Sequence, residues 1–180
     1  MGKRFVEPFE LASEITEKTK PGILLTTKAG DKVNTMVIGW GHIGVVWNMP
    51  IYICFVRDSS FTFDLLEKNP EFTINVQQED HLRPDILQVA GFESGRDVDK
   101  VEKLGLTLVE PEVVSVPAIK ECPITLECEM LYRQELDADA LPEEVRSKFY
   151  RTYGTDEAEP KHALHTMFFG KIVSSYVVED

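Results

Sequence analysis

Hydroxyl residues follow an arginine where an apolar strand is expected to give way to a helix. The segment at residues 56–62 reads VRDSSFT, and the apolar run IYICFV precedes its arginine at residues 51–56. The first backbone N–H groups of a helix lack partners within the helix and favour an anion. The guanidinium of Arg57 adds a planar set of donors that suits phosphate, and Ser59 and Thr62 add hydroxyl groups. The segment is therefore a candidate phosphate site.

The same residues also have a purely structural interpretation. Asp58 is a good N-cap, because its carboxylate can accept a hydrogen bond from a backbone N–H in the first turn of a helix. On this interpretation the helix predicted at residues 59–69 needs no ligand. The segment alone leaves both interpretations open.

A second polar feature lies on the strand predicted at residues 32–40. Its alternation places Asn34, Met36, Ile38 and Trp40 on one face and Thr35 on the other. An asparagine on a face with large apolar side chains is typical of a surface lined by a ligand, and also of a half-buried strand with its asparagine at a sheet edge.

Glycines interrupt the segment that follows this strand. Gly39, Gly41 and Gly44 favour a bulge, or a close approach of the backbone to a flat group. No G-x-G-x-x-G motif opens a helix within a βαβ unit, and there is no Walker loop. Neither a dinucleotide-binding fold nor a P-loop is supported.

A third group of polar residues is found at residues 94–100. Ser94 and Gly95 can turn the chain, and Asp97 can occupy the first turn of a helix that ends near residues 104–105. Arg96 and Lys100 are cations on or beside that helix. Their alternative interpretation is an ordinary solvated face.

Length and charge restrict the class of protein. The 180 residues, 43% of them hydrophobic, predict a single globular domain over residues 1–180 with a substantial core. The formal net charge of −12 argues against general binding to nucleic acid or to an anionic membrane. The sequence begins without the apolar core of a signal peptide, and no run approaches the roughly 20 apolar residues that span a bilayer, so we expect a cytoplasmic location.

The cysteines are expected to be reduced. Cys54, Cys122 and Cys128 include no C-x-x-C pair. The last two lie on one predicted strand, about 20 Å apart, which is too far for a disulfide. We interpret all three as small core residues.

Short strands joined by turns dominate the rest of the chain. Strands are predicted at residues 23–27, 32–40, 51–57, 71–77, 121–133 and 163–178, with one or two more in 106–116 and a bulge at Gly170. Short helices are predicted within 8–20 and 59–69, around 84–89, near 97–104 and at 142–150. This pattern favours a closed antiparallel barrel, because closure removes open sheet edges. The acidic segment 137–161 is expected to be an insertion that forms a lid or a dimer contact.

Taken in order, these segments resemble the flavin reductase-like, FMN-binding split-barrel family, and within it the flavoredoxin-type branch. The resemblance runs from about residue 21 to residue 178. It depends on residues 34–36 with Gly39 and Trp40, residues 56–62, residues 72–76, Gly91 with residues 94–100, residues 119–122 with 126–128, and His165 five residues before Gly170.

The resemblance implies a mainly β, antiparallel split barrel with a few short helices, which forms a homodimer and holds FMN near the dimer interface. It assigns the FMN phosphate to Arg57, Ser59 and Thr62. Lys100 and the turn at Ser94 and Gly95 would close over the phosphate and ribityl end. The other implied contacts lie along or near the flavin ring: Asn34, Thr35, Met36, Gly39, Trp40 and Asn75.

Two positions depart from the family pattern. Asp58 stands where proline is common in the branch, and it brings a carboxylate toward the expected phosphate unless its side chain turns away to cap the helix. His165 is the candidate catalytic residue, but Leu164 replaces the acidic neighbour expected beside it. His162 and His165 have no cysteine or carboxylate partner at a spacing typical of metal ligands, so we predict no metal site.

The implied activity is electron transfer through a flavin, which supplies the redox chemistry itself. In an enzyme, NADH or NADPH would reduce the flavin, and the reduced flavin would serve an oxygenase or a ferric complex. In a carrier, FMN would stay bound and pass electrons between redox proteins, with the net charge steering basic partners. A barrel that has lost flavin and serves only in binding would leave the donors at residues 57–62 and 94–100 without a common explanation.

Overall fold

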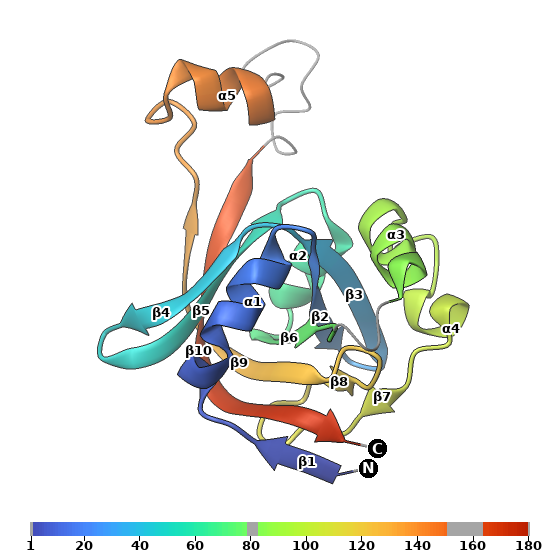
Figure 1. Cartoon of the computed structure of the whole chain (residues 1–180). Helices are drawn as coiled ribbons and strands as arrows, with labels where there is room; N and C mark the ends of the chain where they lie inside the picture. Colours follow the sequence, from blue (N-terminus) through green and yellow to red (C-terminus); the bar gives the residue numbers. More distant parts are fainter. Residues whose placement is uncertain (1, 79–82, 151–163, 180) are drawn as a thin grey trace.

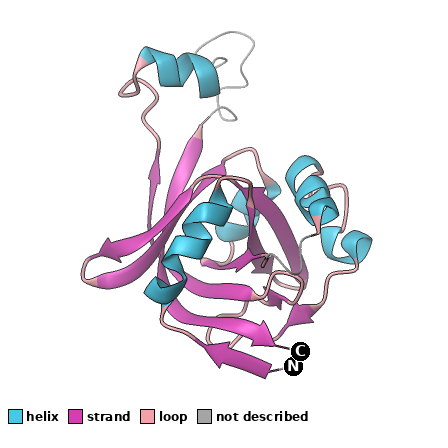
Figure 2. Cartoon of the chain, viewed as in Figure 1, coloured by secondary structure: helices cyan, strands magenta, loops and turns pink. Residues whose placement is uncertain are grey.

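An antiparallel sheet organises the protein, which we describe from a computed structural model covering residues 2–78, 83–150 and 164–179 (Figures 1 and 2). Its strands are β1 (Gly2–Phe5), β2 (Ile23–Ala29), β3 (Lys32–Ile38), β4 (Gly41–Val46), β5 (Met49–Arg57), β6 (Glu71–Val76), β9 (Ile124–Glu135) and β10 (His165–Glu179). A separate two-stranded sheet pairs β7 (Leu108–Val109) with β8 (Ala118–Ile119).

The strand order is β3-β2-β6-β9-β10-β5-β4, and β1 pairs with the far end of β10. The strand count predicted a closed barrel, whereas the path of hydrogen bonds ends at β3 and at β4. The barrel is therefore split between these two strands, as the family resemblance implied. Every pairing in the path is antiparallel.

Strand β4 is the main difference from the sequence prediction, which interpreted its glycines as a bulge. Instead, Gly41 pairs with Cys54, and β4 and β5 form a hairpin. Trp47 and Asn48 turn this hairpin with φ of 53° and 59°, the backbone of a two-residue turn that suits the twist of paired strands. The predicted close approach is present at Gly41, where a Cβ would lie 2.5 Å from the Tyr52 hydroxyl oxygen.

The predicted bulge at Gly170 is confirmed. The pairing of β10 with β9 shifts register between Phe169 and Gly170. A Cβ at Gly170 would overlap the ring of Phe72, so the strand crosses the core at a point where only glycine fits.

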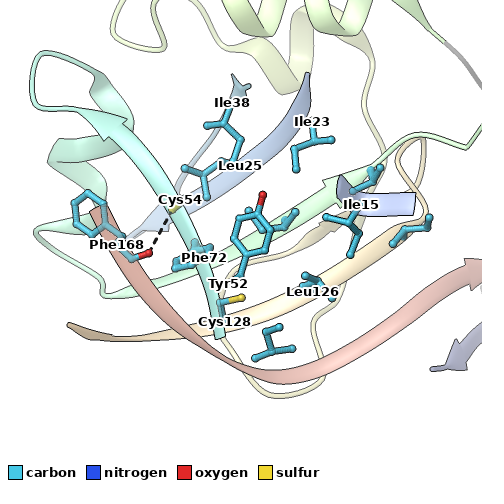
Figure 3. Packing of buried hydrophobic residues seen from close by; sticks show 14 of the residues in the cluster. Ile15, Ile23, Leu25, Ile38, Tyr52, Cys54, Phe72, Leu126, Cys128 and Phe168 are labelled. Carbon is cyan, nitrogen blue, oxygen red and sulfur yellow. Dashed lines mark hydrogen bonds between the residues drawn. The ribbon is translucent and has the colours of Figure 1, made fainter. Parts of the chain in front are cut away.

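Apolar side chains from most of the strands fill the barrel (Figure 3). The core includes Tyr52, Phe72 and Phe168, each fully buried. All three cysteines are free and buried, as predicted, and burial raises the pKa of the Cys122 thiol to about 12. The Sγ atom of Cys54 lies 4.0 Å from the carbonyl oxygen of Phe168 (Figure 3).

Short helices surround the barrel: η1 (Pro8–Leu11), α1 (Ala12–Thr19), α2 (Phe61–Leu66), α3 (Pro84–Phe92), α4 (Lys100–Leu104) and α5 (Glu143–Phe149). Helices α3 and α4 pack beside β3, whereas α5 stands away from the barrel between the ends of β9 and β10 (Figure 1). Residues 151–161 of the predicted acidic insertion lie outside the described residues. None of the helices that the structure describes is long and apolar enough to cross a bilayer.

Candidate functional site

Two adjoining cavities collect most of the predicted site residues. A polar cavity of about 240 Å³ is lined by Asn34, Thr62, Ser94, Gly95 and Lys100, among others. An aromatic cavity of about 320 Å³ is lined by Gly39, Trp40, Phe55, Arg57 and His165, among others. Both cavities share the lining residues Met36, Ser59, Ser60 and Gly91.

Larger cavities exist, but the predicted site residues do not line them. One of about 700 Å³ lies along Phe5, Phe9 and residues 172–175, and another of about 700 Å³ lies along Lys28, Lys32 and Lys68. Volume alone does not identify a ligand site, whereas a few convergent polar groups beside an apolar wall are typical of one. The polar and aromatic cavities have that character.

Helix α2, beside the polar cavity, begins two residues later than the N-cap at Asp58 in the structural interpretation of the sequence would place it. Ser60, not Asp58, is the N-cap of α2, and its hydroxyl accepts a hydrogen bond of 3.2 Å from the Phe63 N–H. A turn closed by the Ser60 N–H and the Arg57 carbonyl, 3.0 Å apart, moves the start of the helix past Asp58. Asp58 lines neither cavity, and its buried Oδ1 atom has no hydrogen-bond partner among the described residues.

Lys100 places a buried cation at the polar cavity. Its residue is only 5% exposed, and its ammonium group donates to the carbonyl oxygens of Thr35 at 3.0 Å and Ala90 at 2.9 Å. Burial lowers the pKa of Lys100, and Glu93 opposes that shift. The two carbonyls leave one of the three ammonium donors unused, and within residues 2–78, 83–150 and 164–179 Lys100 has no carboxylate in an ion pair. An anion in the cavity would compensate this charge.

The polar cavity is closed by the turn at residues 94–97. A Cβ at Gly95 would overlap the amide oxygen of Asn34, so the turn approaches β3 closely only because this residue is glycine. Asn34 in turn donates to the Thr62 hydroxyl at 2.9 Å. Arg96 ties the same turn to α2, because it donates to the Ser59 carbonyl at 2.9 Å and to Asp64 at 2.7 Å.

The wall of the aromatic cavity is built around Trp40. This residue was predicted on the strand at 32–40, but β3 ends at Ile38 and Trp40 lies in the connection to β4. Its ring centroid lies 4.6 Å from that of His165, 5.2 Å from that of Phe149 and 6.2 Å from that of Phe55. Trp40, Phe55 and His165 line the cavity, so one side of it is aromatic.

His165 and Arg57 are opposite each other on β10 and β5. The Nδ1 atom of His165 lies 3.0 Å from the Tyr150 hydroxyl. Burial and, to a lesser extent, the positive charge of Arg57 together lower the pKa of His165 to about 4. His165 is therefore uncharged at neutral pH.

The pKa of His165 predicts a pH dependence of stability. Its folded pKa of about 4 lies below the usual 6.5, so protonation favours the unfolded chain. The stabilisation is complete above about pH 6.5 and falls as the pH drops toward 4, by on the order of 2 kcal/mol. Urea denaturation between pH 4 and pH 7 measures this loss.

In His165→Gln the slope over this pH window should be smaller, whereas the exposed His42→Gln variant should retain the wild-type slope. Equal slopes in the wild type and in His165→Gln would contradict the assignment.

Two predicted contacts lie on the outer face of the sheet, opposite the side chains that fill the barrel. Asn75 donates to the hydroxyls of Thr26 at 3.1 Å and Thr73 at 2.9 Å, and its oxygen accepts from the Ile119 N–H at 3.1 Å. The Thr35 hydroxyl lies 3.1 Å from that of Thr26. The structure does not bring the side chain of Asn75 or Thr35 to either cavity, because both are buried in neighbouring strands.

Sequence reasoning missed Phe149 and Tyr150 as site residues. They end the helix predicted at residues 142–150, which was assigned only to a lid or dimer contact. No local pattern in the sequence indicates that this helix returns to Trp40 and His165.

For metals, the described part of the chain contains no group of three or more His, Cys, Asp or Glu residues able to hold an ion, and His162 lies outside it.

Comparisons with known proteins relate this chain to flavin proteins. The sequence profile of the flavin reductase like domain matches residues 18–180. An uncharacterized protein of Archaeoglobus fulgidus is 34% identical over 105 residues, which are 58% of this chain and 58% of that protein. The match therefore spans less than two thirds of that relative.

Two solved structures are similar in fold. Flavoredoxin of Desulfovibrio vulgaris (Miyazaki F) has a TM-score of 0.64 and 24% identity, covering 89% of this chain and 70% of that chain. Nitrilotriacetate monooxygenase component B from Bacillus cereus has a TM-score of 0.65 and 19% identity, covering 99% and 83%. At these identities the likeness establishes the fold.

Proposed function

The chain belongs to the flavin reductase-like family, and from this premise we propose that it binds FMN in the two adjoining cavities and acts as an oxidoreductase that passes electrons through the flavin. The observation that carries the proposal is Lys100. Among the described residues its buried ammonium group is hydrogen-bonded to two neutral carbonyls and forms no ion pair, so an anion at the cavity that it lines would compensate the charge.

The polar cavity has the donors that a phosphate monoester requires. Lys100 supplies a positive charge, and Ser59, Thr62 and Ser94 supply hydroxyl groups around it. Arg57 lines the aromatic cavity together with Ser59, which lines both cavities, so we assign its guanidinium to the side of the phosphate that faces the aromatic cavity. We assign the phosphate and ribityl chain of FMN to this polar end.

The aromatic cavity suits the flavin ring. Trp40 and Met36 offer apolar surface, and Gly39 lets the backbone approach a flat group. When bound, FMN supplies the redox chemistry, which is the transfer of hydride and electrons. The residues of this chain bind and orient the cofactor, exclude water from its ring and keep an uncharged His165 beside it.

For the direction of electron flow, we propose an enzyme that takes electrons from NADH or NADPH. The aromatic rings and the uncharged His165 in the cavity wall, together with the positive charge of Arg57, favour a neutral planar group such as a reduced nicotinamide over a cation. An oxygenase is a candidate acceptor, in line with the monooxygenase component among the structural relatives. The alternative is a carrier in which FMN stays bound, in line with the flavoredoxin relative and the net charge of −12.

One spectroscopic experiment tests binding and direction together. The purified chain is mixed with FMN, separated from free FMN, and then treated anaerobically with NADH and afterwards NADPH. We expect a retained flavin spectrum that bleaches with at least one nucleotide. Retained flavin that bleaches only with a reduced protein donor would support the carrier instead, and a colourless protein would exclude both.

We also propose a homodimer with FMN near its interface. Exposed aromatic residues form a hairpin patch where the turn between β4 and β5 meets β9, consisting of Trp47 and Tyr132, which are 55% and 44% exposed and whose ring centroids lie 6.2 Å apart. The Tyr132 ring centroid lies 5.3 Å from that of Phe169 on β10. Phe169, Met167 and His165 are alternate residues of β10, so their side chains lie on one face of the sheet. The patch is thus on the same sheet face as the aromatic cavity, and a second copy of the chain would cover both.

Light scattering tests the homodimer. We expect twice the chain mass for the wild type and a monomer for Trp47→Glu, because a carboxylate in the centre of an apolar interface is costly to bury. Phe92→Glu alters another exposed aromatic residue, which is 90% exposed on α3, and serves as the control. A monomeric wild type at micromolar concentration would remove the homodimer.

Gly95→Ala is expected to weaken FMN binding about tenfold while the protein remains folded. The added Cβ overlaps the amide of Asn34, so the turn at residues 94–97 must move away from the polar cavity. The control is Gly44→Ala, since a Cβ at Gly44 meets nothing within 4 Å. A fluorescence titration with FMN measures both variants, and equal affinities would show that the turn does not contribute to the site.

A further inference from the structure

Two residues at the end of helix α5 pack against Trp40 and His165, which line the aromatic cavity. Phe149 packs edge-on against Trp40, with ring centroids 5.2 Å apart, and Tyr150 lies against His165. Tyr150 is only 4% exposed and packs with Ala138 and Leu164 at the base of the α5 excursion. Its position is therefore fixed by packing, and its hydroxyl is directed at the histidine.

The hydrogen bond between Tyr150 and His165 has a definite direction. His165 is uncharged at neutral pH, so only one of its ring nitrogens carries a proton. Burial raises the pKa of Tyr150, so the phenol keeps its hydrogen. Within the described part of the chain, His165 Nδ1 is the one acceptor within reach of that hydrogen, at 3.0 Å. A hydrogen bond donated by Tyr150 to Nδ1 would leave the histidine proton on Nε2.

We propose that Tyr150 is a positioning residue of the site, which fixes His165 in the Nε2-protonated tautomer so that the aromatic cavity offers an N–H donor to a carbonyl or carboxamide group. The ligand implied is a neutral planar molecule with such an oxygen, placed to exchange electrons with the flavin. This inference rests on the proposed function for the identity of the flavin, but the hydrogen bond itself does not.

The surroundings of His165 agree with this role. Nε2 has no hydrogen bond to any described residue, whereas Nδ1 is occupied by Tyr150. Arg57, opposite His165 on β5, places a positive charge beside the imidazole and disfavours a second proton on it. The Trp40 ring, 4.6 Å away and tilted by 44°, limits rotation of the imidazole. A neutral acceptor is thus favoured over a cation at this end of the cavity.

Side-chain ¹⁵N NMR of the histidines tests the proposal without any flavin chemistry. His165→Gln assigns the resonance. At pH 7 we expect wild-type His165 to show a protonated Nε2 and a hydrogen-bonded, unprotonated Nδ1. In Tyr150→Phe the tautomer ratio should move toward Nδ1–H by about three- to tenfold, which corresponds to the loss of one neutral hydrogen bond.

Tyr132→Phe is the matched control, because it removes a hydroxyl that bonds to Gln134 at 2.6 Å outside the cavity. Its His165 spectrum should equal the wild type. An Nδ1-protonated His165 in the wild type would overturn the proposal, as would an unchanged spectrum in Tyr150→Phe. Should Tyr150→Phe fail to fold, the wild-type tautomer alone decides.

A second readout separates this inference from the proposed function. In Tyr150→Phe, FMN affinity should stay within about twofold of the wild type, while the KM for the nicotinamide donor rises several-fold. If the wild type binds no FMN, the proposed function fails, and the tautomer spectrum still tests Tyr150. If FMN binds and the KM and spectrum of Tyr150→Phe are unchanged, the positioning role alone is wrong.

Discussion

Replacing Arg57 with alanine is expected to weaken FMN binding by about 10- to 150-fold, the equivalent of the roughly 1.5–3 kcal/mol contributed by hydrogen bonds to charged groups. Arg57 ends β5 and lines the aromatic cavity together with Ser59, which also lines the polar cavity. A guanidinium there can donate two parallel hydrogen bonds to a phosphate. Titration with FMN, followed by quenching of flavin fluorescence, measures the loss.

Two further variants distinguish phosphate binding from net charge. Arg57→Lys keeps the charge but loses the planar pair of donors, so an intermediate affinity is expected. Arg133→Ala makes the same change in charge, but Arg133 pairs with Glu67 outside both cavities, and this variant should bind FMN as the wild type does. An Arg57→Ala variant with wild-type affinity would remove Arg57 from the site.

The largest expected effect on stability is at Glu127, where Glu127→Gln should lower the free energy of unfolding by about 3 kcal/mol. The fully buried carboxylate accepts from the backbone N–H groups of Glu112 at 2.7 Å and of Val113 and Val114 at 2.8 and 3.2 Å. The Tyr176 hydroxyl also donates to it at 2.8 Å. A glutamine amide would turn an NH₂ group toward some of these donors and leave them unsatisfied.

Urea denaturation measures this difference. Glu121→Gln changes the net charge equally, but Glu121 is only half-buried and holds the single N–H of Thr107, so a loss below about 1 kcal/mol is expected. Equal stabilities for wild type and Glu127→Gln would mean that the loop at residues 110–117 does not depend on this carboxylate.

Local patterns predicted the strands with the clearest alternation. Residues 121–133 alternate except at Pro123 and Leu131, and β9 covers most of that range. The donors at residues 57–62 and 94–100 do meet at one place, because the turn at Gly95 packs against Asn34 and Arg96 reaches the start of α2. The order of these motifs along the chain indicated the flavin reductase-like family, which no single motif identified by itself.

Other features depend on contacts between segments far apart in sequence. Asn34 and Asn75 both occur on alternating strands, but Asn34 lines a cavity, whereas Asn75 links β6 to β2 and β8 on the buried outer face of the sheet. The polar strand β1 has no apolar alternation and forms because β10 offers it an edge. Tyr150 reaches His165 through tertiary packing, so residue type and spacing could not identify it.

The central claim is that the two cavities together hold one FMN, and a direct titration tests it best. Flavin-free wild-type protein is added to FMN, and both the fluorescence and the protein-to-flavin ratio at saturation are recorded, with Lys100→Met measured in parallel. The account predicts one FMN per chain, bound at micromolar concentration or below, and at least tenfold weaker binding by a folded Lys100→Met. A wild-type protein that leaves FMN fluorescence unchanged, or a Lys100→Met variant that binds FMN equally well, would contradict it.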